Sequence, residues 1–396
     1  MVQYNGNVAG RRMKVAIVHD SIGEFGGAER VLLALSEIWT EAPIYTSFTR
    51  RGPFLEKLKG KDIRVSWAHY VPFFATKLHS PLRFLAPLIW GSFDFSKYDV
   101  VISSSSWYIN KGYGQGGPTS LKLRGAIGRP IEFCYCHTPP RWLYGFDSPA
   151  DKKNPIVKAY IVILAHFMRI YDFEKAQKVN YFIANSENIK KRIEKFYRRE
   201  STVIYPPVEV SRENGGSQGS KGSKRNYYLI VSRITGGKGI EMAVEAANKL
   251  GFALKIAGSP SGYSQTYEWV KKNAGPTVEL LGYVPDEELG TLYAGAKAFL
   301  AVQKDEDFGM TLPEALSWGT PVIAYNGGGY PESVTHGKTG ILFDEYSVHG
   351  LIGGIKELGK IRVNPENCIK QAQKFSSARF KKEIQAYILS KLKVIY

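Results

Sequence analysis

The residues best suited to chemistry lie between Ala298 and Glu332, in the stretch AFLAVQKDEDFGMTLPEALSWGTPVIAYNGGGYPE. The pattern predicts an apolar strand, an acidic turn, a Phe-Gly hinge and a helix that begins near Thr311. The first turn of a helix has backbone N–H groups without a partner inside the helix, so such a turn can hold an anion. Glu306 and Glu314 stand on either side of this turn. The stretch therefore predicts an anion site flanked by two carboxylates.

A second group of charged residues follows an apolar strand predicted at Tyr228–Ser232. The next turn, SRITGGKG, contains Arg233 and Lys238, and a helix is predicted after it. Two cations at the carboxyl end of a strand, with a Gly-Gly pair that lets the backbone approach closely, suit a diphosphate group. The turn is not a Walker loop, because it lacks the glycine spacing and the Lys-Ser/Thr pair of that motif. The alternative is that both cations are only surface charges.

His137 is a third candidate, because it follows directly after the apolar strand predicted at Ile131–Cys136. Ligands of open parallel sheets bind beyond the carboxyl ends of the strands, and the Thr-Pro-Pro sequence after His137 stiffens this turn. A lone histidine is otherwise more often structural. Gly26 and Gly27 occupy the corresponding turn after the strand predicted at Met13–His19. A bound ligand and mere close packing of strand and helix explain these two glycines equally well.

The elements that must position these residues are alternating strands and helices, which predict an α/β protein with open parallel sheets covered on both faces. A chain of 396 residues is long enough for two such domains. The boundary is predicted in the run SRENGGSQGSKGSKR, which has nothing to bury. The predicted parts are a first domain at 13–205, a flexible linker at 206–226, a second domain at 227–375, and a last helix at about 376–396 that packs back on the first domain.

The net charge of +17 is concentrated in the first half of the chain. Residues 1–205 contain 30 Lys and Arg against 17 Asp and Glu, whereas residues 206–396 contain 23 against 19. This charge predicts an anionic partner: nucleic acid, an anionic membrane surface or a phosphorylated substrate. The segment Lys77–Trp90 mixes cations and bulky apolar residues, so it either lies on a membrane surface or forms an irregular core helix. The apolar run Ala159–Met168 is too short to span a bilayer and predicts a buried helix.

The three cysteines, Cys134, Cys136 and Cys368, are too few for a disulfide framework. Cys134 and Cys136 lie inside a predicted apolar strand, which suits buried side chains rather than a pair of metal ligands. A reducing compartment, the cytoplasm, is therefore expected.

Several motifs that follow one another along the chain resemble those of retaining glycosyltransferases of family 4. They are HDSIGEFGGAER, YDVVISSSSWYINKG, CYCHTPPRWLYG, SRITGGKG, EDFGMTLPE and GGGYPE, and the match covers nearly the whole chain. The motifs of the first domain look like the mannosyltransferase branch that builds surface polysaccharides and glycolipids. The resemblance implies the GT-B fold, in which two Rossmann-like, doubly wound α/β domains face a cleft.

The resemblance also implies a role for each candidate residue. Arg233 and Lys238 would bind the diphosphate of the donor, and His137 would lie beside the reacting centre. Glu306 would face the hydroxyls of the transferred sugar and Glu314 would hold the ribose, so that His137, Glu306, Arg233 and Lys238 form the implied catalytic set. The remaining implied contacts are the backbone of Phe308, Gly309, Met310 and Thr311 around sugar and phosphate, Gly26 and Gly27 beside the donor, and Lys111 and Arg141 at the acceptor.

Two features of these motifs allow other interpretations. Thr311 and Glu314 also spell a capping box, which would explain Glu314 without a ligand. The DED turn at 305–307 contains a D-x-D, the metal-diphosphate signature of the other large glycosyltransferase fold. Two cations predicted beside this turn can take the charge of the leaving group, so no metal site is expected. The sequence departs from the mannosyltransferase branch at SSSWYIN and at the YD pair 171–172, which leaves the acceptor open.

The sequence thus predicts hexosyl transfer from a nucleotide sugar, GDP-mannose or else a UDP-sugar, with retained anomeric configuration and no further cofactor. The expected acceptor is a lipid-linked molecule or a glycan, reached by a cytoplasmic protein that is peripheral on the inner membrane face. One alternative is another sugar-nucleotide enzyme of the same fold, such as an epimerase; a phosphorylase would need a lysine in a pyridoxal phosphate context, for which the sequence gives no support. The other is a basic nucleic-acid binder, which is disfavoured because the cations are spread along the chain without a recognition motif.

Overall fold

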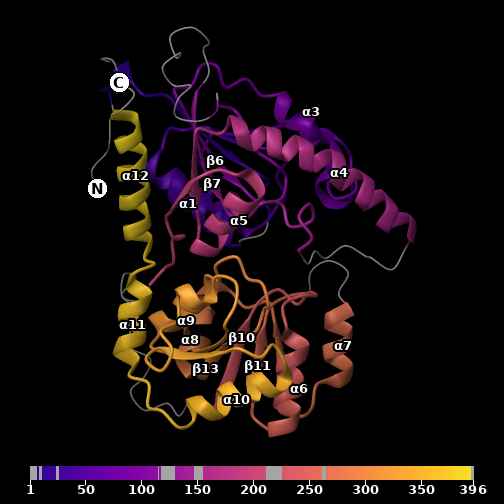
Figure 1. The fold of residues 1–396 in the computed structure, drawn as a ribbon, viewed down its shortest axis with the longest axis vertical. Coiled ribbons are helices and arrows are strands. Elements are labelled where there is room, and N and C mark those ends of the chain that lie inside the picture. Colours follow the sequence, from indigo (N-terminus) through magenta and orange to yellow (C-terminus); the bar gives the residue numbers. More distant parts are fainter. Residues whose placement is uncertain are drawn as a thin grey trace. The chain divides into compact units, whose positions relative to one another are not determined.

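The computed structural model describes residues 7–8, 11–23, 26–114, 116, 130–146, 155–210, 225–260 and 265–393. The chain divides into two compact units (Figure 1). The N-terminal domain consists of Met1–Phe146, Pro155–Pro207 and Ala378–Tyr396, and the C-terminal domain contains Val208–Ser377. A short antiparallel pair, β1 (Asn7–Val8) and β2 (Arg11–Arg12), precedes the first large sheet.

The N-terminal domain contains a parallel sheet of seven strands in the order β5-β4-β3-β6-β7-β8-β9. The strands are β3 (Val15–His19), β4 (Ile44–Thr46), β5 (Ile63–Val65), β6 (Val100–Ser105), β7 (Ile131–Cys136), β8 (Tyr181–Ala184) and β9 (Ser201–Val203). Every residue of β3, β6 and β7 is buried. Strands that are covered on both faces become continuous apolar runs rather than alternating ones, and this is the pattern the sequence shows.

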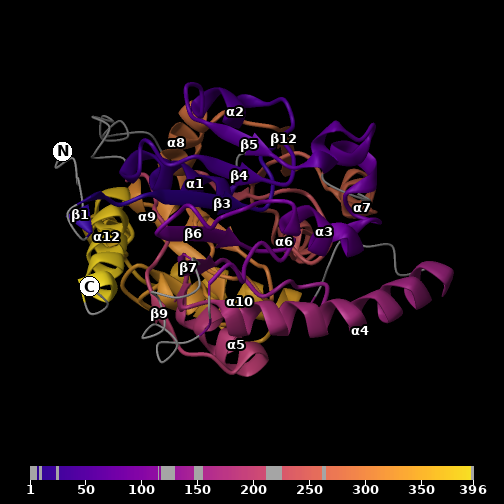
Figure 2. The same cartoon turned by 90° about the horizontal axis from the view of Figure 1, so that it is seen from above.

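Helices and helical turns cover both faces of this sheet (Figure 2). They are α1 (Gly27–Ile38), α2 (Pro53–Lys57), η1 (Trp67–Tyr70), η2 (Phe74–Leu78), η3 (Arg83–Leu85), α3 (Ala86–Gly91), α4 (Pro155–Lys178), α5 (Glu187–Tyr197) and α12 (Ser377–Lys393). Side chains of a strand alternate between the faces. Accordingly, Ile17 and Ile102 pack with α1 and α12, whereas Val18 and Val101 pack with α3 and α4.

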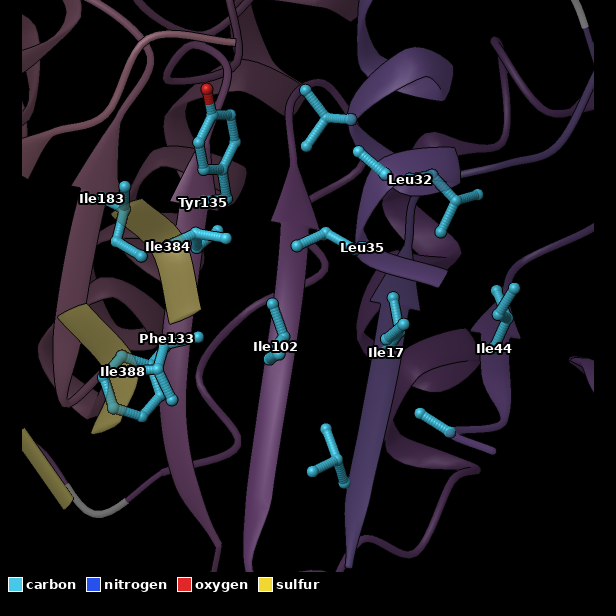
Figure 3. Close-up of a cluster of buried hydrophobic side chains, with 14 of the residues drawn as sticks. Ile17, Leu32, Leu35, Ile44, Ile102, Phe133, Tyr135, Ile183, Ile384 and Ile388 are labelled. Atoms are coloured by element: carbon cyan, nitrogen blue, oxygen red, sulfur yellow. The ribbon is translucent and has the colours of Figure 1, made fainter. Parts of the chain in front are cut away.

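The helix α12 completes the core of the N-terminal domain although it comes last in the chain. Phe380, Ile384, Ile388 and Leu392 recur every four residues, which places them on one face of the helix, and all four are buried. Figure 3 shows Ile384 and Ile388 beside the strand residues Phe133, Tyr135 and Ile183.

The C-terminal domain contains a second parallel sheet, with six strands in the order β12-β11-β10-β13-β14-β15. The strands are β10 (Tyr227–Val231), β11 (Leu254–Ala257), β12 (Val278–Gly282), β13 (Ala296–Ala301), β14 (Val322–Tyr325) and β15 (Gly340–Phe343). The helices are α6 (Ile240–Leu250), α7 (Gln265–Asn273), α8 (Asp286–Gly295), α9 (Thr311–Ser317), η5 (Tyr330–Glu332), α10 (Val348–Leu358) and α11 (Pro365–Gln373). One face packs against α6, α7 and α10, and the other against α8, α9 and α11.

The start of the predicted linker is structured. Val208 and Val210 are buried, and the N–H of Val208 donates to the carbonyl of Phe375 over 2.9 Å. The segment that enters the C-terminal domain is therefore joined by a backbone hydrogen bond to the segment that leaves it. Residues 211–224 of the predicted linker and 394–396 of the predicted last helix lie outside the described residues.

The prediction that Ala159–Met168 is a buried helix is wrong for one side of the helix. The segment lies within α4, but Val162, Ile163 and Phe167 are strongly exposed. Apolar composition indicated burial, but it cannot show on how many sides a helix finds neighbours.

Shortening one buried side chain of α12 tests whether this helix belongs to the N-terminal core. We expect Ile384→Ala to lower the free energy of unfolding by about 2–5 kcal/mol, because it leaves a cavity among buried side chains. Urea unfolding measures this change. The control Lys382→Ala alters an exposed position of the same helix and should change stability by no more than about 0.5 kcal/mol. Equal effects of the two variants would contradict the packing described above.

Candidate active site

Two loops that are distant in sequence meet at one edge of the C-terminal sheet. The strands β10 and β13 are parallel neighbours, so the loops after them leave from the same edge. Lys238 Nζ, from the loop after β10, lies 3.1 Å from Glu306 Oε2, from the loop after β13. The two side chains are 23% and 20% exposed. The structure thus brings together two of the predicted site residues as a solvent-accessible ion pair.

The two loops also touch through their backbones. A Cβ added at Gly239 would lie 2.1 Å from the carbonyl oxygen of Val302, and Gly239 has a φ of +71°. No other residue type fits both conditions well. Arg233, the other predicted cation, is exposed at the start of the same loop, directly after β10. The SRITGGKG turn therefore places both of its cations after the carboxyl end of β10.

The glycine loop at 327–329 lies directly against the acidic turn. The N–H of Gly329 donates to the carbonyl of Glu306 over 2.9 Å, and a Cβ at Gly328 would come within 2.4 Å of the same oxygen. The loop therefore fixes the backbone of Glu306 rather than only closing the β-α-β unit. This close contact is the physical reason for the GGG sequence.

The hinge between the acidic turn and α9 has one defined conformation. Phe308 is buried with its ring 5.4 Å from that of Phe375. Gly309 has a φ of +86°, and a Cβ there would lie 2.6 Å from the ring of Tyr330. Met310 is the last residue before α9, which begins at Thr311. The segment between Glu306 and the first turn of α9 is thus held in place by packing against Phe375 and Tyr330.

Glu314 is buried in the first turn of α9, and its Oε2 accepts a hydrogen bond of 2.9 Å from the hydroxyl of Tyr293 on α8. The capping-box interpretation does not describe this helix. Thr311 is its first helical residue, Met310 occupies the cap position, and no side chain caps the helix there. Tyr293 orients Glu314 instead.

In the N-terminal domain, His137 follows β7 and its ring is held by a serine. Its Nε2 lies 2.8 Å from Ser104 Oγ, and the same oxygen lies 3.0 Å from Nδ1 of His19. Ser104 and His19 are register partners in β6 and β3. Three neighbouring parallel strands thus carry these three polar side chains at their carboxyl ends.

The protons of this array can be assigned from its chemistry. A hydroxyl has one proton, so Ser104 donates to one imidazole and accepts from the other. Glu29 Oε1 lies 4.0 Å from Nε2 of His19, which favours the proton of His19 on that nitrogen. Ser104 then donates to His19 and accepts from Nε2–H of His137, whose Nδ1 keeps its lone pair. The N–H of Gly26 donates to the other oxygen of Glu29 over 3.1 Å, which connects the predicted Gly26-Gly27 turn to His137.

The two residues predicted at the acceptor lie in different environments. Lys111 is buried, its ammonium is paired with Asp172, and it lies 5.0 Å above the ring of Tyr197. The prediction that Lys111 contacts an acceptor is therefore wrong, because its ammonium lies in the core of the domain. Arg141 is half-buried in the turn after His137, with its guanidinium 5.5 Å from the ring of Phe146.

Sequence analysis missed His19, Ser104, Glu29 and Tyr293 as parts of the sites. The first two had a detectable signal, since His19 ends an otherwise apolar strand and Ser104 lies in the run of three serines that ends β6. The bond between Gly26 and Glu29 spans only three positions at the start of α1, whereas the approach of Glu29 to His19 and the bond of Tyr293 to Glu314 join elements that are distant in the sequence.

Burial, together with the nearby His19, lowers the pKa of His137 to about 3. The unfolded chain therefore binds a proton on this residue below pH ~6.5 that the folded chain does not bind. The free energy of unfolding should fall as the pH falls from ~6.5 toward 3, with a contribution from His137 of up to about 1.4 kcal/mol per pH unit. In urea unfolding at a series of pH values, His137→Gln should reduce this slope relative to the unchanged protein, whereas His349→Gln, at an exposed position, should not. An unchanged slope in His137→Gln would show that His137 is not buried in the neutral form.

Comparison with known proteins gives a family match for the segment that carries the Lys238–Glu306 pair. Residues 211–375 match the family described as glycosyl transferases group 1. A D-inositol 3-phosphate glycosyltransferase of Corynebacterium glutamicum is 30% identical over 259 residues, which cover 59% of this chain and 59% of that protein. An alpha-1,3/1,6-mannosyltransferase of Candida glabrata is 23% identical over 384 residues, 83% of this chain and 79% of that protein. The chain spans about half the length of several curated relatives that it matches.

Solved structures extend the likeness to both domains. The HepE protein of Anabaena, in complex with UDP and glucose, has a TM-score of 0.64 at 19% identity and covers 96% of this chain and 100% of that one. Sucrose-phosphate synthase of Thermosynechococcus elongatus has a TM-score of 0.69 at 16% identity, with coverage of 97% and 100%. The predicted fold class, two Rossmann-like domains with parallel sheets, is confirmed. The chain is thus a protein of GT-B fold whose residues 211–375 match the group 1 glycosyl transferases.

Proposed function

We propose that this protein transfers a hexosyl group from a nucleotide sugar to an acceptor hydroxyl, with retained anomeric configuration. The observation that carries the proposal is the Lys238–Glu306 pair at the carboxyl edge of β10 and β13, within the segment that matches the glycosyl transferases. Ligands of open α/β sheets bind at such an edge. The retaining outcome and the assignment to family 4 rest on the sequence motifs.

The proposed reaction breaks the bond between the anomeric carbon and a diphosphate oxygen. That oxygen keeps the electron pair, and the acceptor hydroxyl forms the new bond and loses its proton. Negative charge therefore grows on the diphosphate, where Arg233, Lys238 and the first turn of α9 stabilise it without need of a metal ion. Glu306, held 3.1 Å from Lys238, binds hydroxyls of the sugar that is attached to the same diphosphate.

The proposed donor is GDP-mannose, with Glu314 on the ribose hydroxyls and the backbone of Phe308–Thr311 around sugar and phosphate. The motifs of the N-terminal domain and the similarity to the mannosyltransferase of Candida glabrata favour mannose. A UDP-sugar is the second candidate, because the similar HepE protein was solved with UDP and with UDP-glucose.

The proposed acceptor is a lipid-linked molecule or a glycan, bound by the N-terminal domain beside His137 and Arg141, while the Gly26-Gly27 turn lies beside the donor. The charge of that half of the chain favours an acceptor or a membrane surface with anionic groups. An epimerase of the same fold remains the alternative reaction. It would act on the sugar nucleotide without any acceptor, whereas a transferase releases nucleotide and lengthens the acceptor.

Replacing Lys238 tests the catalytic role of the pair. We expect Lys238→Ala to lower kcat by about 100- to 1,000-fold, because one preorganised contact with the growing charge is lost. Nucleotide release from the donor in the presence of acceptor measures the rate. The matched control Lys249→Ala changes an exposed lysine at the end of α6 and should leave the rate unchanged. A folded Lys238→Ala protein with a near-normal rate would contradict the proposed role of Lys238 in stabilising the leaving diphosphate.

Thermal unfolding with a panel of ligands tests the donor. A ligand at about 100 times its Kd stabilises the protein by about 2.7 kcal/mol, so GDP and GDP-mannose should raise the Tm more than UDP and UDP-glucose. The shift should shrink in Lys238→Ala, because the diphosphate loses a cation. A larger shift with UDP and UDP-glucose would favour a UDP-sugar over GDP-mannose as the donor. No shift with any nucleotide would contradict nucleotide-sugar binding.

A further inference from the structure

The N-terminal domain exposes an unusual number of large apolar side chains on two neighbouring segments. One segment is 67–88, which includes η1, η2, η3 and part of α3, and the other is the part of α4 from Tyr160 to Ile170. We call these side chains the α4 surface. They are Trp67, Tyr70, Phe73, Phe84, Leu88, Tyr160, Val162, Ile163, Phe167 and Ile170.

The helix α4 is apolar on both sides. Leu164, Ala165 and Met168 pack toward the domain. On the other side, Val162, Ile163, Phe167 and Ile170 are between 49% and 64% exposed. A helix that is apolar all round normally finds neighbours on every side, so the outer side of α4 is suited to a partner that the chain itself does not supply.

The two segments form one continuous surface. The hydroxyl of Tyr160 on α4 donates to the carbonyl of Pro81, and side chains of α3 and α4 share one buried cluster. Figures 1 and 2 both show α3 and α4 beside each other. Six of the ten exposed side chains of the α4 surface are aromatic. Trp and Tyr gather at membrane interfaces, and Phe is common on the apolar face of interfacial helices.

The two segments that carry the α4 surface contain cations but no carboxylates. The sequence contains no Asp or Glu from Ile63 to Phe93, nor from Pro155 to Tyr171. Within these ranges lie Lys77, which is exposed, Arg83, which is half-buried, and Arg169, which is exposed. Apolar side chains that are mixed with cations and lack carboxylates complement the interfacial region of a bilayer with anionic headgroups.

We propose that the α4 surface binds an anionic lipid bilayer, with α4 lying in the interface and its outer side chains inserted among the lipids. Among the residues that the structure describes, no helix is long and apolar enough to cross a membrane, which fits a helix that lies flat. This inference deepens the lipid-linked acceptor of the proposed function by naming the surface that meets the membrane. Vesicle binding needs neither donor nor acceptor, so its failure leaves the transfer reaction untouched.

Co-sedimentation with vesicles tests the proposal. The full chain should pellet with vesicles of phosphatidylcholine and phosphatidylglycerol, less with phosphatidylcholine alone, and less at high salt. The double variant Ile163→Ser/Phe167→Ser should lower the partition coefficient about ten- to a hundredfold, because two large apolar side chains no longer leave water. Lys77→Gln should lower binding about fivefold on anionic vesicles only.

The matched control is Tyr283→Ser, which removes an apolar side chain that is 68% exposed on the C-terminal domain. This variant should bind vesicles as the unchanged protein does. Thermal unfolding establishes that each variant is folded. No binding to anionic vesicles, or equal loss in Tyr283→Ser and in the double variant, would overturn the proposal. So would light scattering that shows a dimer of the unchanged protein dissociating in the double variant without any vesicle binding, because the surface would then join two copies of the chain.

Discussion

The parallel pairing of β10 with β13 is the contact on which the candidate site of the C-terminal domain depends. It sends the loops after both strands out of the same edge, so that Lys238 and Glu306, 68 positions apart, form an ion pair. Gly239 and Gly328 are needed because the loop backbones approach more closely than a Cβ allows. The chemistry of this site therefore comes from side chains, but its geometry comes from strand order and glycines.

The same constraint acts in the N-terminal domain with different residues. The order β3-β6-β7 places His19, Ser104 and His137 at one edge. Their hydrogen bonds make the tautomer of one imidazole dependent on that of the other, because the single hydroxyl proton of Ser104 can be donated to only one of them. A neutral His137 follows from burial, which lowers its pKa. Strand order thus determines the position of this histidine, and burial determines that it is neutral.

Sequence reasoning succeeded where the signal is local. Apolar runs predicted the strands, and the SRITGGKG turn predicted a cationic loop at a strand end, because both follow from backbone periodicity and glycine conformation. It failed where residues that are distant in the sequence determine the environment of a side chain. Lys111 looked like a ligand-binding cation, but Asp172 on α4 holds it in the core. The outer side of α4 was expected to be buried, since apolar composition does not show whether a neighbour exists.

The contrast between the two lysine pairs explains why one is structural and the other is suited to a ligand. Removing either partner of the buried Lys111–Asp172 pair leaves an uncompensated charge in the interior, at a cost of about 3–5 kcal/mol. No anion can therefore displace Asp172 without disrupting the core. The Lys238–Glu306 pair is about one fifth exposed, so water screens it and its net stability is small. In the proposed binding of a nucleotide sugar, a phosphate would pair with the ammonium of Lys238 at little cost, and Glu306 would accept hydrogen bonds from hydroxyl groups of the sugar.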